Sequence, residues 1–198
     1  MRKIFMLAIM VACAAPAAFA QDDYNKADFF VGYSHNRVDV GISDGDADPD
    51  DIFDEREGFH GVNVSAKGNI SRYVGIKGDY AFHRKSFSES FGGTTFDADL
   101  DLHTLVGGVE FKDNAKETKV KPFAHFMAGI AHARADIEGI PDFGGESETG
   151  FAGVIGGGLD FKVSDRVDFR AVQFDYNPVR SGGSTGHNFR IGIGIVFR

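Results

Sequence analysis

Apolar and polar side chains alternate with a period of two along most of the chain, and the alternation is most regular near its end. Between Phe189 and Phe197, every second residue is Phe or Ile, and the residues between them are Arg, Gly, Gly and Val. A period of two is typical of a β-strand, so one face of this segment is apolar and the other is small or charged. The segment is about as long as a tilted strand that crosses a bilayer, and it predicts a transmembrane β-strand.

The same alternation predicts seven further strands, at about residues 27–37, 59–68, 73–83, 102–111, 120–134, 151–162 and 167–176. The connections between them alternate in length. We expect long polar loops at 38–58, 84–99, 135–150 and 177–186, and short turns at 69–72, 112–119 and 163–166. Bacterial transmembrane barrels have an even strand count, long extracellular loops and short periplasmic turns. The pattern therefore predicts an all-β fold, an eight-stranded antiparallel up-and-down transmembrane β-barrel.

One strand breaks the alternation. In the segment 167–176, Val172, Phe174 and Tyr176 share a face, and Arg170 has the same parity. Either a β-bulge shifts the phase of this strand, or Arg170 extends along the lipid face to the membrane interface.

The face opposite the aliphatic residues is charged. We expect these side chains to point inward: Lys67, Lys77, Asp79, Glu110, Asp160, Asp175 and Arg190. A soluble barrel such as a lipocalin is the alternative fold, but its apolar interior is a poor match for these charges. A barrel of eight strands is just wide enough for side chains to fill, so we predict an internal network of ion pairs. The alternative is a pathway for protons or ions.

The first 20 residues differ from the rest. Arg2 and Lys3 precede an apolar run at 4–18, and Ala-Phe-Ala at 18–20 matches a signal peptidase site. We therefore predict a cleaved secretory signal peptide at residues 1–20 and an outer-membrane β-barrel domain at 21–198. Lipoprotein processing at Cys13, in an imperfect lipobox, is the alternative.

Composition narrows the function classes. The formal charge of −8 becomes −10 when the signal peptide is removed, and an acidic chain is a poor match for nucleic acid. The one cysteine lies in the predicted signal peptide, so we expect no disulfide in the exported chain. No segment of the predicted mature chain is apolar for long enough to be a spanning helix, which leaves a closed barrel as the way to cross a membrane.

Three features of the chain match a known family. They are the Ser-Asp-Arg turn followed by Val-Asp-Phe-Arg at 164–170, the segment Gly-Gly-Gly-Leu-Asp-Phe at 156–161, and the Phe-rich last strand. The chain resembles the small eight-stranded outer-membrane β-barrels, that is, the OmpA-type transmembrane domain, OmpX-like proteins and opacity-type porin-like proteins. The resemblance implies a monomer in the bacterial outer membrane, in contact with lipid and lipopolysaccharide.

The same resemblance implies insertion by the barrel-assembly machinery, which recognises the last strand. Family members usually end on an aromatic residue, whereas here Arg198 follows Phe197. We expect no peptidoglycan-binding domain after the last strand.

The first long loop is strongly acidic. Five of its carboxylates have the spacing of positions 1, 3, 5, 7 and 12 of an EF-hand loop, namely Asp44, Asp46, Asp48, Asp50 and Glu55. Pro49 stands where that loop needs glycine, and no helix is predicted on either side. We interpret the segment as a solvated charged loop. The alternative is a loose divalent-cation site for Ca²⁺ or Mg²⁺, and we expect no other cofactor.

Six of the seven histidines fall near predicted extracellular strand ends: His35, His60, His83, His103, His132 and His187. His125 lies in mid-strand. We interpret the six as amphipathic side chains at the membrane interface; the alternative is a ring that binds a transition metal or senses pH.

An enzyme of this class needs a nucleophile and a base close together. Ser34 and His35 are adjacent in sequence, but neighbours on a strand face opposite ways. We therefore expect a non-enzymatic barrel that presents acidic loops, in a structural, envelope-integrity or adhesion role. The alternatives are a narrow porin-like channel and a lipid-modifying enzyme.

Overall fold

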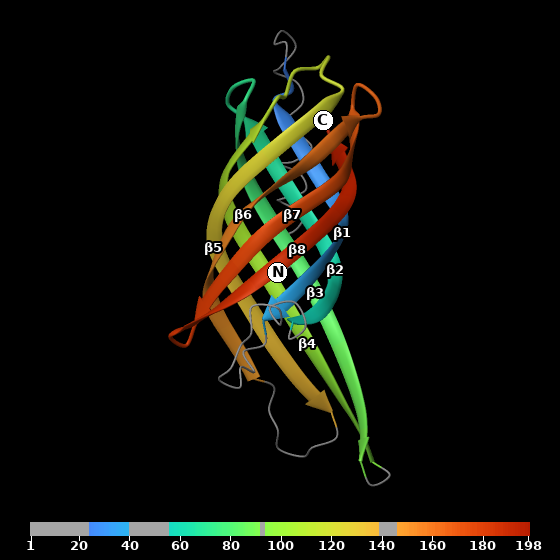
Figure 1. The fold of residues 1–198 in the computed structure, drawn as a ribbon, viewed down its shortest axis with the longest axis vertical. Helices are drawn as coiled ribbons and strands as arrows, with labels where there is room; N and C mark the ends of the chain where they lie inside the picture. The colour runs from blue at the N-terminus through green and yellow to red at the C-terminus, as the bar shows by residue number, and fades with distance from the viewer. Residues whose placement is uncertain (1–23, 40–55, 92–93, 139–145) are drawn as a thin grey trace, which may run out of the picture.

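The computed structural model describes residues 24–39, 56–91, 94–138 and 146–198, and in this part of the chain eight antiparallel strands form a closed barrel (Figure 1). The strands are β1 (Ala27–Asp39), β2 (Arg56–Asn69), β3 (Val74–Phe91), β4 (Thr94–Lys112), β5 (Val120–Glu138), β6 (Glu146–Lys162), β7 (Val167–Ser181) and β8 (Ser184–Phe197). The predicted fold class is confirmed. Among the described residues, no helix is long and apolar enough to cross a membrane.

Each strand pairs with its neighbour in sequence, and β8 closes the barrel on β1. Following the paired residues once round the barrel from Ala27 leads back to β1 at Arg37, ten residues further along. The intermediate partners are Gly68, Ile76, Val109, Phe126, Ile155, Tyr176 and Phe189. This stagger tilts the strands relative to the barrel axis, as Figure 1 shows.

The predicted strand faces are confirmed. The aliphatic and aromatic members of each alternation are exposed on the outside, for example Ile76, Phe126 and Ile191, each about half exposed. The residues between them are buried inside. Short connections at residues 70–73, 113–119 and 163–166 gather at one end, which the loop-length rule makes the periplasmic end.

The strands continue further at the other, extracellular end than the sequence predicts. Most of the predicted loops 84–99, 135–150 and 177–186 is strand, and the β3–β4 hairpin projects beyond the others in Figure 1. The prediction was wrong there because strands outside the lipid can pair through their backbones without an apolar face. The alternation of apolar and polar residues therefore ends before the backbone hydrogen bonds between the strands do. A turn at Gly182 and Gly183, with φ of 56° and 92°, joins β7 to β8; this left-handed region favours glycine.

A β-bulge in β7 resolves the phase of Arg170. Across one step of β6, from Leu159 to Asp160, the pairing on β7 moves two residues, from Val172 to Arg170. Ala171 is the extra residue. The bulge turns Arg170 into the barrel, where it is 2% exposed, so the bulge alternative holds and the lipid-facing alternative is wrong.

Candidate functional site

A network of buried charges fills the periplasmic half of the barrel. Lys67 Nζ lies 2.8 Å from both Asp28 and Glu110. Lys112 Nζ lies 2.7 Å from Asp28 and 3.2 Å from Asp160. All five side chains are buried, so each charge is compensated by its neighbours and not by bulk water.

Arg170 joins this network to aromatic rings. Its Nε and Nη2 donate to the two oxygens of Asp160 at 2.7 and 3.0 Å, and its Nη1 donates to Gln173 at 2.7 Å. The guanidinium lies 4.4 Å from the ring centre of Phe30 and 4.0 Å from that of Phe123. These contacts use both the fork and the flat face of the arginine.

A second cluster lies nearer the extracellular end and is centred on Arg190. Its Nε and Nη2 donate to Asp175 at 2.8 and 2.6 Å, and its Nη1 donates to Asp79 at 3.1 Å. His125 Nε2 lies 2.8 Å from Asp175. Asn63 donates to Asp79 at 2.9 Å. The cluster therefore connects strands on opposite sides of the barrel.

A third group closes the periplasmic end. Asp168 accepts from Lys121 at 3.0 Å and from Arg198 at 2.8 Å. The side chain of Arg198 is 1% exposed. The residue that departs from the family pattern is thus folded into the base of the barrel.

Little space remains inside. The cavity at the centre of the network is about 10 Å³, at the lower limit for one water of roughly 10–15 Å³. Above the charges, small and aliphatic side chains pack together: Val106, Met127, Ala131, Ala152 and Val154. In the part of the chain that the structure describes, side chains fill the interior from the periplasmic end up to the extracellular mouth.

All seven residues predicted to point inward are buried. The prediction of inward charges left out others that belong to the network: Asp28, Lys112, Lys121, Asp168, Arg170 and Arg198. The sequence places Lys112 in a turn. It has the same parity as the inward Glu110, so a predicted strand one residue longer would include it on the inner face. For Arg170 the sequence leaves an inward and a lipid-facing alternative, and the bulge decides for the inward one.

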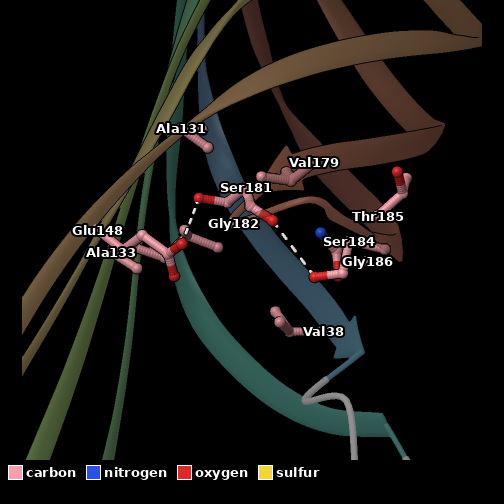
Figure 2. Close-up of a pocket in the computed structure, with 13 residues that line it drawn as sticks. Val38, Ala131, Ala133, Glu148, Val179, Ser181, Gly182, Ser184, Thr185 and Gly186 are labelled. Atoms are coloured by element: carbon pink, nitrogen blue, oxygen red, sulfur yellow. Dashed lines mark hydrogen bonds between the residues drawn. The ribbon is translucent and has the colours of Figure 1, made fainter.

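The extracellular mouth holds a cavity of about 390 Å³ (Figure 2). Its walls include the small or apolar side chains of Leu102, Ala131 and Val179. At its rim, Ser181 Oγ donates to Glu148 at 2.5 Å, and Ser184 Oγ donates to the Ser181 carbonyl at 3.3 Å. Figure 2 shows these groups around the β7–β8 turn. The arrangement is an open cup whose wall combines apolar side chains with the polar groups of the rim.

Ser34 and His35 face opposite sides of the wall, as predicted. Ser34 is instead paired with His83, whose Nε2 lies 2.9 Å from Ser34 Oγ, and both side chains are buried. Within the described residues, His83 Nδ1 has no hydrogen-bond partner. A serine–histidine nucleophile needs an acidic group on the second ring nitrogen and access for substrate. The pair has neither here.

Two metal sites were possible from the sequence, one at the histidines and one in the first acidic loop. Among the described residues, no three His, Cys, Asp or Glu side chains come close enough to hold a metal ion. The acidic set of residues 44–55 lies outside the described residues, as does the predicted signal peptide, so both stay predictions.

Comparison with known proteins identifies the architecture. A family model described as outer membrane protein beta-barrel domain matches residues 4–197. No curated protein sequence matches the chain. Among solved structures, the chain is similar to Neisserial surface protein A (NspA), with 13% identity, 89% of this chain and 99% of that chain covered, and a TM-score of 0.65.

It is also similar to Ail, the attachment invasion locus protein of Yersinia pestis, with 19% identity, 88% and 99% coverage, and a TM-score of 0.56. OprG from Pseudomonas aeruginosa matches with 12% identity, 89% and 98% coverage, and a TM-score of 0.52. At these identities the likeness is one of fold.

Proposed function

Because the chain belongs to the family of outer membrane protein β-barrel domains, we propose that it is a non-enzymatic barrel that presents acidic segments at the cell surface, in a structural or adhesive role. The observation that carries this proposal is the filled interior. When the lumen is occupied by its own side chains, what remains for function is the outer surface and the extracellular connections.

The network argues against the channel alternative. An ion that crosses the barrel must separate pairs such as Arg190–Asp175 and Lys67–Glu110, which are 2.6 and 2.8 Å apart and buried. Removing one partner of a buried pair costs about 3–5 kcal/mol. Several pairs lie in series along the axis, so a permanent conducting path is disfavoured.

The charge of the two ends supports a role at the surface. Nine carboxylates lie between Asp39 and Glu57 in the sequence, with Arg56 as the one basic residue there. The three short periplasmic connections are nearly balanced, with four basic and three acidic residues. A surface partner is therefore expected to be cationic, or to be bridged by divalent cations.

The filled interior also bears on catalysis. The serine–histidine pair inside the barrel is shielded from substrate and lacks an acid, which supports a barrel without enzymatic activity. A test is to incubate the folded protein with lipopolysaccharide and to measure the mass of the lipid A. We expect no change in its acyl chains; loss or gain of a chain contradicts the proposal.

The sharpest test of the proposed function is conductance. Purified protein inserted into a planar bilayer should give no stable unitary conductance, whereas a trimeric porin in the same bilayer serves as the positive control. The double variant Asp175→Ala, Arg190→Ala, which empties part of the lumen, should leak more than the wild type. A stable, ion-selective conductance of the wild-type protein would establish the channel alternative.

A further inference from the structure

Four histidines on the outside of the barrel, one in each extracellular hairpin, occupy equivalent positions beside a hydroxyl group, and a fifth outward histidine, His35, lies next to His60 with their ring centres 4.8 Å apart. On its strand, each of the four is the first outward-facing residue beyond the apolar row. They are His60 after Val62 on β2, His103 after Leu105 on β4, His132 after Ile130 on β5 and His187 after Phe189 on β8. We call these four residues the histidine ring. Its position marks the point at which each strand leaves the hydrocarbon on the extracellular side.

Each histidine of the ring contacts a hydroxyl group on the other strand of its own hairpin. The distances from the hydroxyl oxygen to His Nδ1 are 2.5 Å for Tyr33–His60, 2.8 Å for Tyr80–His103, 2.8 Å for Thr149–His132 and 2.5 Å for Tyr176–His187. The three tyrosines lie on β1, β3 and β7, at the level where an aromatic girdle meets the membrane interface.

The repeated use of Nδ1 fixes the tautomer. At the three tyrosine contacts, the phenol is a stronger acid than a neutral imidazole, so we assign the hydroxyl as the donor and Nδ1 as the acceptor; this assignment does not extend to the alcohol of Thr149 beside His132. A neutral ring that accepts at Nδ1 carries its proton on Nε2. The three tyrosine contacts thus leave the Nε2–H groups of His60, His103 and His187 as donors near the extracellular ends of their strands.

From this arrangement we propose that the histidine ring binds the phosphate groups of lipopolysaccharide in the outer leaflet. Imidazole N–H groups donate well to phosphate oxygens, and a protonated ring also supplies charge. The ring lies just outside the apolar band, where phosphorylated head groups of that leaflet are found.

Neighbouring charges complement phosphate. Arg134 and Arg180 are exposed on outward positions close to the ring, and Arg84 lies on β3 two residues beyond Phe82. The outward carboxylate nearest to His103 is Asp101, and Arg84 neutralises it through two hydrogen bonds of 2.6 Å. With Asp101 compensated by Arg84, Arg134 and Arg180 are exposed cations at this end of the barrel.

A purely interfacial role predicts something else. Histidine and tyrosine rings both settle at a membrane interface because of their amphipathic shape. That role needs neither the hydroxyl contacts nor phosphate in the lipid, so replacing tyrosine by phenylalanine would change little.

The test uses the folded mature protein in detergent micelles. It is titrated with bisphosphorylated lipid A, with the same lipid after enzymatic removal of its phosphates, and with inorganic phosphate alone. Binding is followed by native mass spectrometry, and the ring tautomers by ¹⁵N NMR of the histidine side chains. Each variant is used only after its migration on SDS gels shows that it has folded.

We expect the dephosphorylated lipid to bind about tenfold more weakly, as for the loss of charge-assisted hydrogen bonds. The variant His60→Phe, His103→Phe, His132→Phe, His187→Phe keeps the rings and should lose this preference. The variant Tyr33→Phe, Tyr80→Phe, Tyr176→Phe keeps the histidines, and should reduce the preference while its ¹⁵N spectrum changes to mixed tautomers. The control Phe111→Leu, Phe161→Leu, at the periplasmic end, should bind like the wild type.

Three results would overturn the proposal. They are equal affinity for the lipid with and without phosphate, a phosphate preference that survives loss of all four histidines, and inorganic phosphate that binds as tightly as the lipid.

Discussion

At the scale of single residues, the charged side chains divide into enclosed pairs and surface pairs. Arg190 and its partners Asp79 and Asp175 are each about 1% exposed or less. Arg84, which pairs with Asp101, has a side chain that is 53% exposed. A surface pair contributes little because water competes for both charges, whereas breaking an enclosed pair leaves a charge without solvent.

Replacing arginine by methionine should therefore lower the free energy of unfolding more in an enclosed pair than in a surface pair. Arg190→Met should lower the free energy of unfolding by about 3–5 kcal/mol, because two carboxylates lose their cation. Arg84→Met should cost less than about 1 kcal/mol. Urea unfolding in lipid vesicles, followed by far-UV circular dichroism because the chain has no tryptophan, measures both. Equal losses would mean that the interior charges are solvated.

Asp113, in the periplasmic connection between β4 and β5, makes the stability of the fold depend on pH. Arg72 donates to Asp113 at 2.8 and 3.0 Å, and Thr118 donates to the same carboxylate at 2.8 Å. The hydrogen bonds from Arg72 hold the pKa of Asp113 well below its ordinary value of 3.8, against a smaller opposing effect of desolvation. A lowered pKa in the folded state stabilises the fold above the ordinary value and ceases to do so as the pH falls through the folded one.

Arg72→Gln should therefore lower the stability at pH 7 by less than about 1 kcal/mol, because both groups are partly exposed. The difference from the wild type should shrink as the pH falls below about 4, where the unfolded carboxyl takes up its proton. Urea midpoints measured from pH 7 downward test this. A difference that grows in acid would show that Arg72 acts through another group.

At the scale of elements, β7 shows how one extra residue places a whole row of side chains. With Ala171 in the bulge, Asp168 and Arg170 lie on the same inner face as Gln173 and Asp175. A regular strand of the same sequence would turn Asp168 and Arg170 to the lipid. The bulge thus decides whether Arg170 reaches Asp160 and whether Asp168 reaches Lys121.

Two single-residue deletions in β7 test whether assembly depends on Asp168 and Arg170 facing inward. Deleting Ala171 removes the bulge but leaves Arg170 and Asp168 facing inward, so the barrel should still assemble. Deleting Phe169 keeps the bulge and turns Asp168 to the lipid, so the yield of folded protein should fall several-fold, given a cost of about 2–4 kcal/mol for a badly placed charge on a lipid face. The fraction of heat-modifiable protein in outer membranes is the measurement. Equal failure of both deletions would show that strand length alone matters.

At the scale of the whole molecule, closure removes the free edges of the sheet. β8 pairs with β1 over nine residue pairs, from Phe29–Phe197 to Arg37–Phe189. Backbone groups in a closed barrel are paired within the protein, so there is no edge from which the sheet can open in detergent.

The intact chain should therefore migrate faster on SDS gels unboiled than boiled. A chain that ends before Ser184 lacks β8 and cannot close, so its mobility should be the same in both conditions. Identical migration of the intact protein, boiled or not, would contradict a closed and detergent-resistant barrel.

The period-two pattern is enough to predict the strand count, the order of the connections and the direction of most side chains. Parity along a strand is a local property, and a single face pattern such as that of Phe189–Phe197 is enough to orient it. For the same reason, the seven inward charges from Lys67 to Arg190 could be predicted without any knowledge of their partners. The positions of the histidines near the extracellular strand ends also follow from counting residues.

Which side chains meet depends on the assembled barrel. Arg190 and Asp79 are 111 residues apart and Lys67 and Glu110 are 43 apart, and their contact depends on the ten-residue stagger that all eight pairings set together. The same holds for Ser34–His83 and for the hydroxyl group beside each histidine of the ring. The apolar pattern signals a phase problem at Arg170 but does not decide between a bulge and a lipid-facing arginine, and it gives no sign of the long extracellular strand ends. Register around a closed barrel is a global quantity, whereas the period of two is a local one.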